Sequence, residues 1–154
     1  MIIDIFGRPK SLTSKEVKYA AQFFAECMMG GRLSKNLDLM ITFEKTKTAD
    51  GFCFPVDEGR HGPRCFEIAL NRDMLRRKSL RVLAHEIVHV KQYARKELKQ
   101  LDANVASFNG KVRKVTGDYL QYLFLPWEVE AFGTENALMT AYEAHLKSKK
   151  ISFK

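Results

Sequence analysis

The pentapeptide His85-Glu86-Ile87-Val88-His89 constrains this chain more than any other segment. Residues four apart on an α-helix point in nearly the same direction, one turn along the axis, so both imidazoles can reach one metal ion. The glutamate that follows the first histidine would then lie beside the metal rather than on it. The motif therefore predicts a helix that carries a metal site.

The residues around this motif repeat with the period of an α-helix. Apolar side chains fall on one side of a helical wheel, and the two histidines lie on the other side, beside Val82 and Gln92. We expect a helix over residues 73–100, with the histidines on a second face that another layer must cover. The apolar stripe consists of Leu80, Leu83, Ile87, Val90, Ala94, Leu98 and Leu101.

A catalytic zinc ion needs a third protein ligand and an open position. On the wheel of the last predicted helix, Glu128 lies in an apolar stripe, whereas Glu130 points almost the opposite way, toward a position that suits solvent. Because a buried carboxylate needs a partner, we expect Glu128 to be the third ligand. Glu135, on the same face, is the alternative ligand or a hydrogen-bond partner of a ligating histidine. The helix dipole would also stabilise a carboxylate at Glu128, in the first turn after Pro126, without any metal.

Turn and strand patterns predict a small sheet ahead of the motif helix. Thr13 and Glu16 form a capping box for a first helix, which Gly30-Gly31 ends. Residues 37–43 and 66–70 are expected strands, and 52–54 a short one.

The rest of the chain is expected to be mostly helical. Residues 105–115 have a weak helix pattern, and the aromatic segment 119–125 is expected to pack over the site. A last helix should begin at Pro126 and run to about residue 147. The order predicts an α+β fold: a small early sheet packed on the motif helix, with a C-terminal helix that completes the metal site.

The 154 residues suit one domain, expected over residues 1–146, with a basic tail over 147–154. No apolar run is long enough to cross a membrane, and the first residues do not form a signal peptide. The three cysteines lack metal-site spacing and favour reduced thiols, with Cys27 in the core. The expected compartment is the cytoplasm.

The net charge of +8 comes partly from a basic cluster just before the motif. Such a cluster favours contact with acidic partners or weak contact with nucleic acid. An ordinary solvated surface is the alternative, because no nucleic-acid-binding motif accompanies the charge. The cluster consists of Arg72, Arg76, Arg77, Lys78 and Arg81.

Two segments together resemble the zincin metallopeptidases: residues 84–93, which contain the motif, and Pro126-Trp127-Glu128-Val129-Glu130-Ala131. Among zincins, the chain is most similar to small uncharacterised zincin-like proteins of phage and bacterial origin. The Glu128-x-x-Ala131 segment resembles the gluzincin pattern, although Phe132 stands where gluzincins often carry an aspartate. No Gly-x-x-His follows His89, which disfavours the metzincin branch.

The resemblance implies Zn²⁺ held by His85, His89 and Glu128, and hydrolysis of a peptide bond by zinc-activated water with Glu86 as general base. It also implies a protein or peptide substrate that pairs with the free edge of the strand over residues 65–71.

A further hydrogen-bond donor for the oxyanion is expected, and Tyr119, Tyr122 and His145 are all candidates. Two other functions stay open: a zinc-stabilised interaction module without turnover, and a nucleic-acid-associated protease. The intact Glu86 favours catalysis, because a structural zinc site needs no base at that position.

Overall fold

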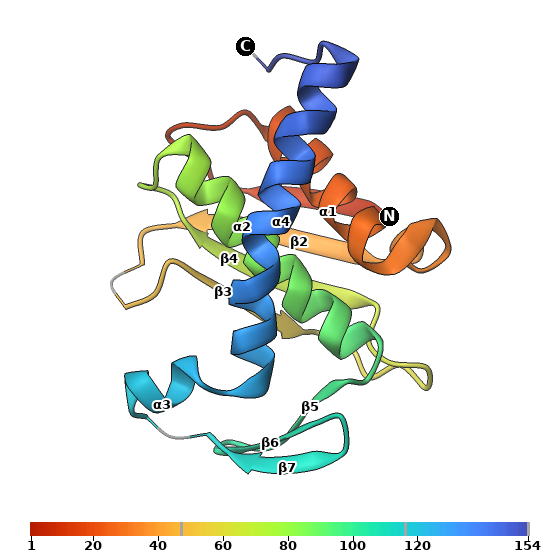
Figure 1. Cartoon of the computed structure of the whole chain (residues 1–154), viewed down its shortest axis with the longest axis vertical. Helices are drawn as coiled ribbons and strands as arrows, with labels where there is room; N and C mark the ends of the chain where they lie inside the picture. The colour runs from red at the N-terminus through yellow and green to blue at the C-terminus, as the bar shows by residue number, and fades with distance from the viewer. Residues whose placement is uncertain (47, 116, 154) are drawn as a thin grey trace.

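The structure, a computed structural model, describes residues 1–46, 48–115 and 117–153. It has the mixed α+β composition that the sequence predicts (Figure 1). In chain order the elements are β1 (Ile2–Phe6), α1 (Ser14–Ser34), β2 (Asp38–Glu44), β3 (Gly51–Pro55), β4 (Cys65–Asn71), α2 (Arg76–Ala94), β5 (Leu98–Asp102), β6 (Val105–Phe108), β7 (Lys111–Lys114), α3 (Tyr119–Leu123) and α4 (Pro126–Lys149).

The main sheet has the strand order β1-β2-β4-β3. β1, β2 and β4 run parallel, and β3 is antiparallel to β4. Side chains alternate along each strand, so Ile41 and its register partner Ile68 both face the core. Because β4 is paired on both sides, the prediction of a free edge at residues 65–71 is wrong, and the edge strands are β1 and β3.

The helices cover one face of this sheet in two layers (Figure 1). α1 and α2 lie on the sheet, and the apolar stripe of α2 from Leu80 to Ala94 is buried there. α4 packs across the opposite side of α2. It therefore supplies the cover that the two histidines need, as the amphipathic pattern of α2 requires.

The segment between α2 and α4 differs from the prediction. α2 ends at Ala94, and Lys96 adopts a left-handed conformation with φ 60°, so residues 98–102 continue as strand β5 instead of helix. Residues 105–115 form the hairpin of β6 and β7, turned by Asn109 and Gly110 at φ 48° and 79°. Two successive positive φ values characterise the Asn-Gly hairpin turn.

Smaller differences lie near the chain ends. β1 was not expected from the sequence, and it pairs in parallel with β2. Cys27 is exposed rather than part of the core. α1 continues past a kink at Gly30 (φ 74°) to Ser34, and α4 continues to Lys149, so the expected basic tail begins inside a helix. Within the described residues, no helix has the length and apolar character needed to cross a membrane.

Candidate metal centre

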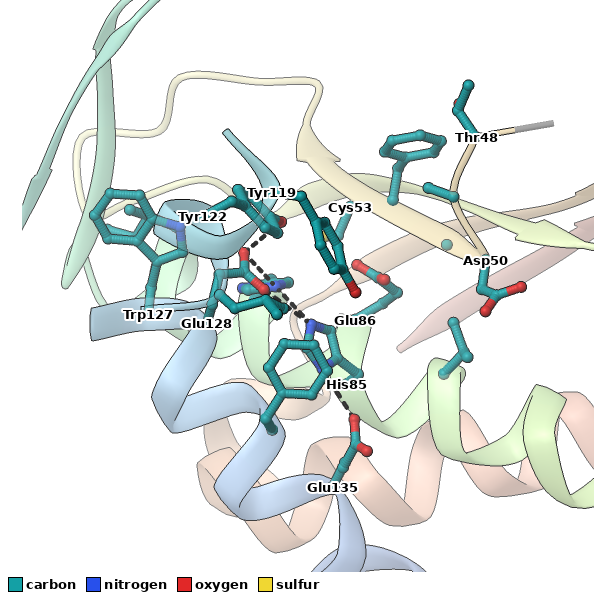
Figure 2. Close-up of a pocket in the computed structure, with 18 of the residues that line it drawn as sticks. Thr48, Asp50, Cys53, His85, Glu86, Tyr119, Tyr122, Trp127, Glu128 and Glu135 are labelled. Atoms are coloured by element: carbon teal, nitrogen blue, oxygen red, sulfur yellow. Dashed lines mark hydrogen bonds and ion pairs between the residues drawn. The ribbon is translucent and has the colours of Figure 1, made fainter. Parts of the chain in front are cut away.

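The two motif histidines and Glu128 converge between α2 and α4. Figure 2 shows His85 and Glu128 pointing toward each other from these two helices. The Nε2 atoms of His85 and His89 are 3.2 Å apart. The Glu128 carboxylate lies 3.3 Å from Nε2 of His85 and 3.4 Å from Nε2 of His89. One potential ligand atom from each residue falls within 4.8 Å of the others, and all three residues are buried.

The Nδ1 atom of each imidazole is engaged by an acceptor. Nδ1 of His85 lies 3.0 Å from Oε2 of Glu135, and Nδ1 of His89 lies 2.8 Å from Oε1 of Gln92. A carboxylate oxygen and an amide oxygen can only accept, so both Nδ1 atoms carry the hydrogen. The lone pairs of both rings are then on Nε2, and they point at the shared position.

The orientation of the Gln92 amide follows from its other contacts. Its Nε2 donates to the carbonyl oxygen of Trp127 at 3.0 Å and to Oε2 of Glu130 at 2.8 Å. Both of those atoms are acceptors, so the amide nitrogen must face them and the amide oxygen must face His89. Through these hydrogen bonds Gln92, which is fully buried, links His89 to α4.

The donor set fits Zn²⁺. Two neutral imidazole nitrogens and one carboxylate face one another, and without a cation or added protons their electron pairs would repel. Two nitrogens, one oxygen and an open side toward a pocket form the ligand set of a catalytic zinc ion. The hydrogen-bonded Nδ1 atoms are the kind of outer support that orients histidine ligands.

The side chains of the site shift one another's pKa values. Burial alone would lower the pKa of His85, but the carboxylates of Glu128 and Glu135 outweigh it and raise the pKa to about 9. Burial would raise the pKa of Glu128, but hydrogen bonds with His85 and His89 lower it to about 2. Glu128 is therefore an anion throughout the neutral range, and it attracts either protons or a metal cation to the two imidazoles.

Glu86 lies beside this cluster without joining it. Burial raises the pKa of its carboxyl to about 7, and the neighbouring histidines offset part of this rise. The backbone of β3 approaches it closely, because a Cβ added at Gly51 would lie 2.7 Å from Oε1 of Glu86. A carboxyl with a pKa near neutrality is suited both to accept and to return a proton.

A pocket of about 730 Å³ opens over the three converging residues and Glu86. It is bounded by β3 and by α3, whose Tyr122 donates a hydrogen bond of 2.6 Å to Oε1 of Glu128. Tyr119 and Leu123 also line this pocket, whereas Leu120 and Phe124 are exposed, so the prediction that the segment 119–125 packs over the site is confirmed in part. His145 lies elsewhere, 2.8 Å from the hydroxyl of Tyr19, and is not an oxyanion donor here.

The carboxylates of α4 have different partners, which the helical wheel predicted only in part. Glu135 is the partner of Nδ1 of His85, one of its two expected roles. Phe132 packs its ring against His85, with ring centroids 4.6 Å apart, at the position where gluzincins often have aspartate. Glu130 is half-buried rather than exposed, because it accepts from Gln92 and from Lys91.

Three contributors were missed from the sequence: Gln92, Tyr122 in its role toward Glu128, and Gly51. The only sequence signal for Gln92 is its place three residues after His89, on the histidine side of the wheel. Gly51 reaches the site through tertiary packing alone, so no local spacing could reveal it. Tyr122 was expected only as a hydrogen-bond donor to the oxyanion, and its bond to Glu128, six residues further along, was not predicted.

The basic cluster before the motif is largely neutralised. Each cation has an acidic partner: Arg72 with Asp73, Arg76 with Glu16, Arg77 with Glu143, Lys78 with Asp50, and Arg81 with Glu135. The local charge available for nucleic acid is therefore smaller than the sequence suggests.

The interpretation of the site depends on the geometry of its own side chains. Compared with protein-family models, with curated proteins and with solved structures, the chain matches none of them.

Proposed function

We propose that this protein is a zinc-dependent metallopeptidase, with Zn²⁺ held by His85, His89 and Glu128 and with Glu86 as general base. One observation carries the proposal: three lone-pair donors converge, both imidazoles have Nδ1 engaged elsewhere, and the carboxyl group of Glu86 lies beside them in a pocket without joining them. A purely structural metal site has no need of that additional carboxyl group or of an open side.

Bound Zn²⁺ would acidify a water molecule and polarise a substrate carbonyl group. Glu86 would accept the proton from that water and later deliver it to the amine that leaves, and its raised pKa suits both transfers. Tyr122 holds the Glu128 carboxylate in place through its hydroxyl. Because Tyr122 donates its single hydroxyl hydrogen to Glu128, Tyr119 is the remaining candidate for a hydrogen bond to the oxygen that gains charge.

The substrate would be a protein or peptide in extended conformation. β3 is one of the two edge strands of the main sheet, and its residues Gly51, Phe52 and Cys53 line the pocket next to Glu86. An added strand hydrogen-bonded to this edge would bring a peptide bond over the site with little demand on sequence. All three cysteines are free, which agrees with a reducing, cytoplasm-like compartment as part of the proposal.

The test compares zinc content and cleavage of an unfolded protein such as casein in two sets of variants. Glu86→Gln should retain zinc and lose cleavage, because the amide cannot accept the proton. Glu128→Ala should weaken zinc binding far more than Glu130→Ala, a matched change two residues away. Equal cleavage by wild type and Glu86→Gln, or purified protein that takes up no zinc, would refute the proposal.

Zinc uptake without any cleavage by the wild type would instead favour the alternative of a zinc-stabilised interaction module. The third possibility, a nucleic-acid-associated protease, has weaker support, because the cations of the basic cluster before the motif each have an acidic partner. Its signature would be DNA binding that falls steeply with salt.

A further inference from the structure

The pocket extends beyond the proposed catalytic residues toward the C-terminal end of α2. Figure 2 shows Asp50 on one side of His85, and Tyr122 and Trp127 on the other. The lining at the second end is mostly apolar and continues into a small separate core beneath β5 and β6. It is formed by Tyr93, Leu98, Val115, Leu123 and Trp127.

The sheet that borders this apolar end is positively charged. Residues 95–118 contain six Lys or Arg and three Asp or Glu. Its four strand cations, Lys99, Lys111, Arg113 and Lys114, are all exposed. Among the described residues, none of the four forms an ion pair, in contrast to the paired cations of the basic cluster before the motif.

Strand register separates these cations into two faces. Arg113 is opposite Ala106, which is opposite Gln100, and Gln100 lines the pocket. Lys111 is similarly in one row with Phe108 and Leu98. Residues that are paired across strands share a face, so Lys111 and Arg113 lie on the pocket side.

The other two strand cations lie on the opposite face. Lys99 pairs with Ser107, and Lys114 pairs with Val105. Both partners alternate with the pocket-side residues of β6. Two cations of this sheet therefore face the pocket and two face away from it. The second pair can be substituted as a control that changes the net charge by the same amount.

The direction of a bound peptide follows from β3. Just before this strand, Asp50 pairs with Lys78 at the start of α2, and beyond it Gly62 lies against the carbonyl of Ala94 at the end of α2. β3 thus runs along α2 in the same sense. A peptide that pairs with β3 in the slightly more stable antiparallel mode enters at β5 with its N-terminal part.

We infer that the sheet β5–β6–β7 selects substrates that carry a bulky apolar residue and acidic residues on the N-terminal side of the cleaved bond. The apolar residue would enter the end lined by Trp127 and Leu98, and the carboxylates would face Lys111 and Arg113. Leu98 lies on β5, and Lys111 and Arg113 lie on β7, two strand spacings or about 10 Å away. The acidic residues of the substrate would therefore lie a few residues before its apolar residue. The inference rests on the proposed peptidase function.

The same cations could attract nucleic acid, but the surface favours a polypeptide. The pocket-side cations share their sheet face with Leu98, which lines the apolar end of the pocket, and the other two strand cations lie on the opposite face. An apolar side chain and a carboxylate can occupy these two features at once, whereas a phosphate backbone would use only the cations.

The experiment measures peptide binding to zinc-loaded, full-length Glu86→Gln protein by fluorescence anisotropy. The probes are labelled peptides with two aspartates upstream of a phenylalanine, the same peptide with lysines for aspartates, and one with the order reversed. A single-stranded oligonucleotide of equal charge is the fourth probe. The variants are Lys111→Glu/Arg113→Glu and the control Lys99→Glu/Lys114→Glu, which changes the net charge by the same amount.

The acidic peptide should bind about tenfold more tightly than the lysine peptide and the reversed peptide, as expected for a few partly exposed ion pairs. The pocket-side pair of changes should abolish this preference, and the control pair should alter it less than about twofold. Equal loss in both double variants, equal binding of the reversed peptide, or tighter binding of the oligonucleotide would overturn the inference. Casein cleavage by the otherwise wild-type chain reports separately on the proposed function.

Discussion

Replacing Gly51 by alanine tests whether the edge strand positions the general base. The added Cβ would lie 2.7 Å from Oε1 of Glu86 and 2.6 Å from Cγ1 of Val82. Ordinary contacts are about 3.5 Å or more, so the carboxylate must move by about 1 Å. A displacement of that size at a reacting group costs roughly 100-fold in rate. We therefore expect kcat for Gly51→Ala to fall about 100-fold.

Zinc affinity should stay unchanged in this variant, because the three atoms nearest to the added Cβ belong to Val82 and Glu86 and not to the three ligands. The assay is single-turnover cleavage of a quenched fluorescent peptide, with metal content and thermal unfolding measured on the same samples. Gly133→Ala is the matched control, since an added methyl group there meets no atom within 4 Å. The reasoning is refuted if Gly51→Ala cleaves like the wild type, or if its loss of activity follows a loss of zinc.

Three further predictions follow from buried contacts. Gln92→Leu removes the acceptor of a histidine Nδ1 and should raise the Kd for zinc roughly 10- to 100-fold in a chelator competition; an unchanged Kd would contradict this. Arg76→Ala leaves the almost fully buried Glu16 without its cation and should lower the free energy of unfolding by about 2 kcal/mol in urea titrations. Burial raises the pKa of the Cys53 thiol well above its usual value, so iodoacetamide should label exposed Cys27 first, as followed by mass spectrometry.

The parts of the site that lie on one helix were predictable from the sequence. Helical period fixes where His85, Glu86 and His89 point relative to the apolar stripe of α2, and it separates Glu128 from Glu130 on α4. The cover over the histidines was predictable for the same reason. What the wheel could not supply is distance between helices, which is why Glu130 proved to be half-buried against α2.

The errors have physical causes. Leu98 and Leu101 continue the spacing of the α2 stripe, but the left-handed Lys96 ends the helix before them. The turn residues Asn109 and Gly110 were a local hairpin signal that a weak helical pattern obscured. The existence of β1 and the edge position of β3 depend on pairings between distant segments, and alternation within one strand does not specify its neighbours.

The candidate ligands lie far apart in the chain, since Glu128 follows His85 by 43 positions. An ion shared by α2 and α4 would therefore act as a cross-link, and closing a loop of that size removes about 4 kcal/mol of conformational entropy from the unfolded chain. The sheet β5–β6–β7 and α3 lie within the segment that this cross-link would close. Metal occupancy would consequently set the rigidity of the charged hairpin as well as the chemistry beside it, and a chelated protein should be clipped by an added protease first in this loop.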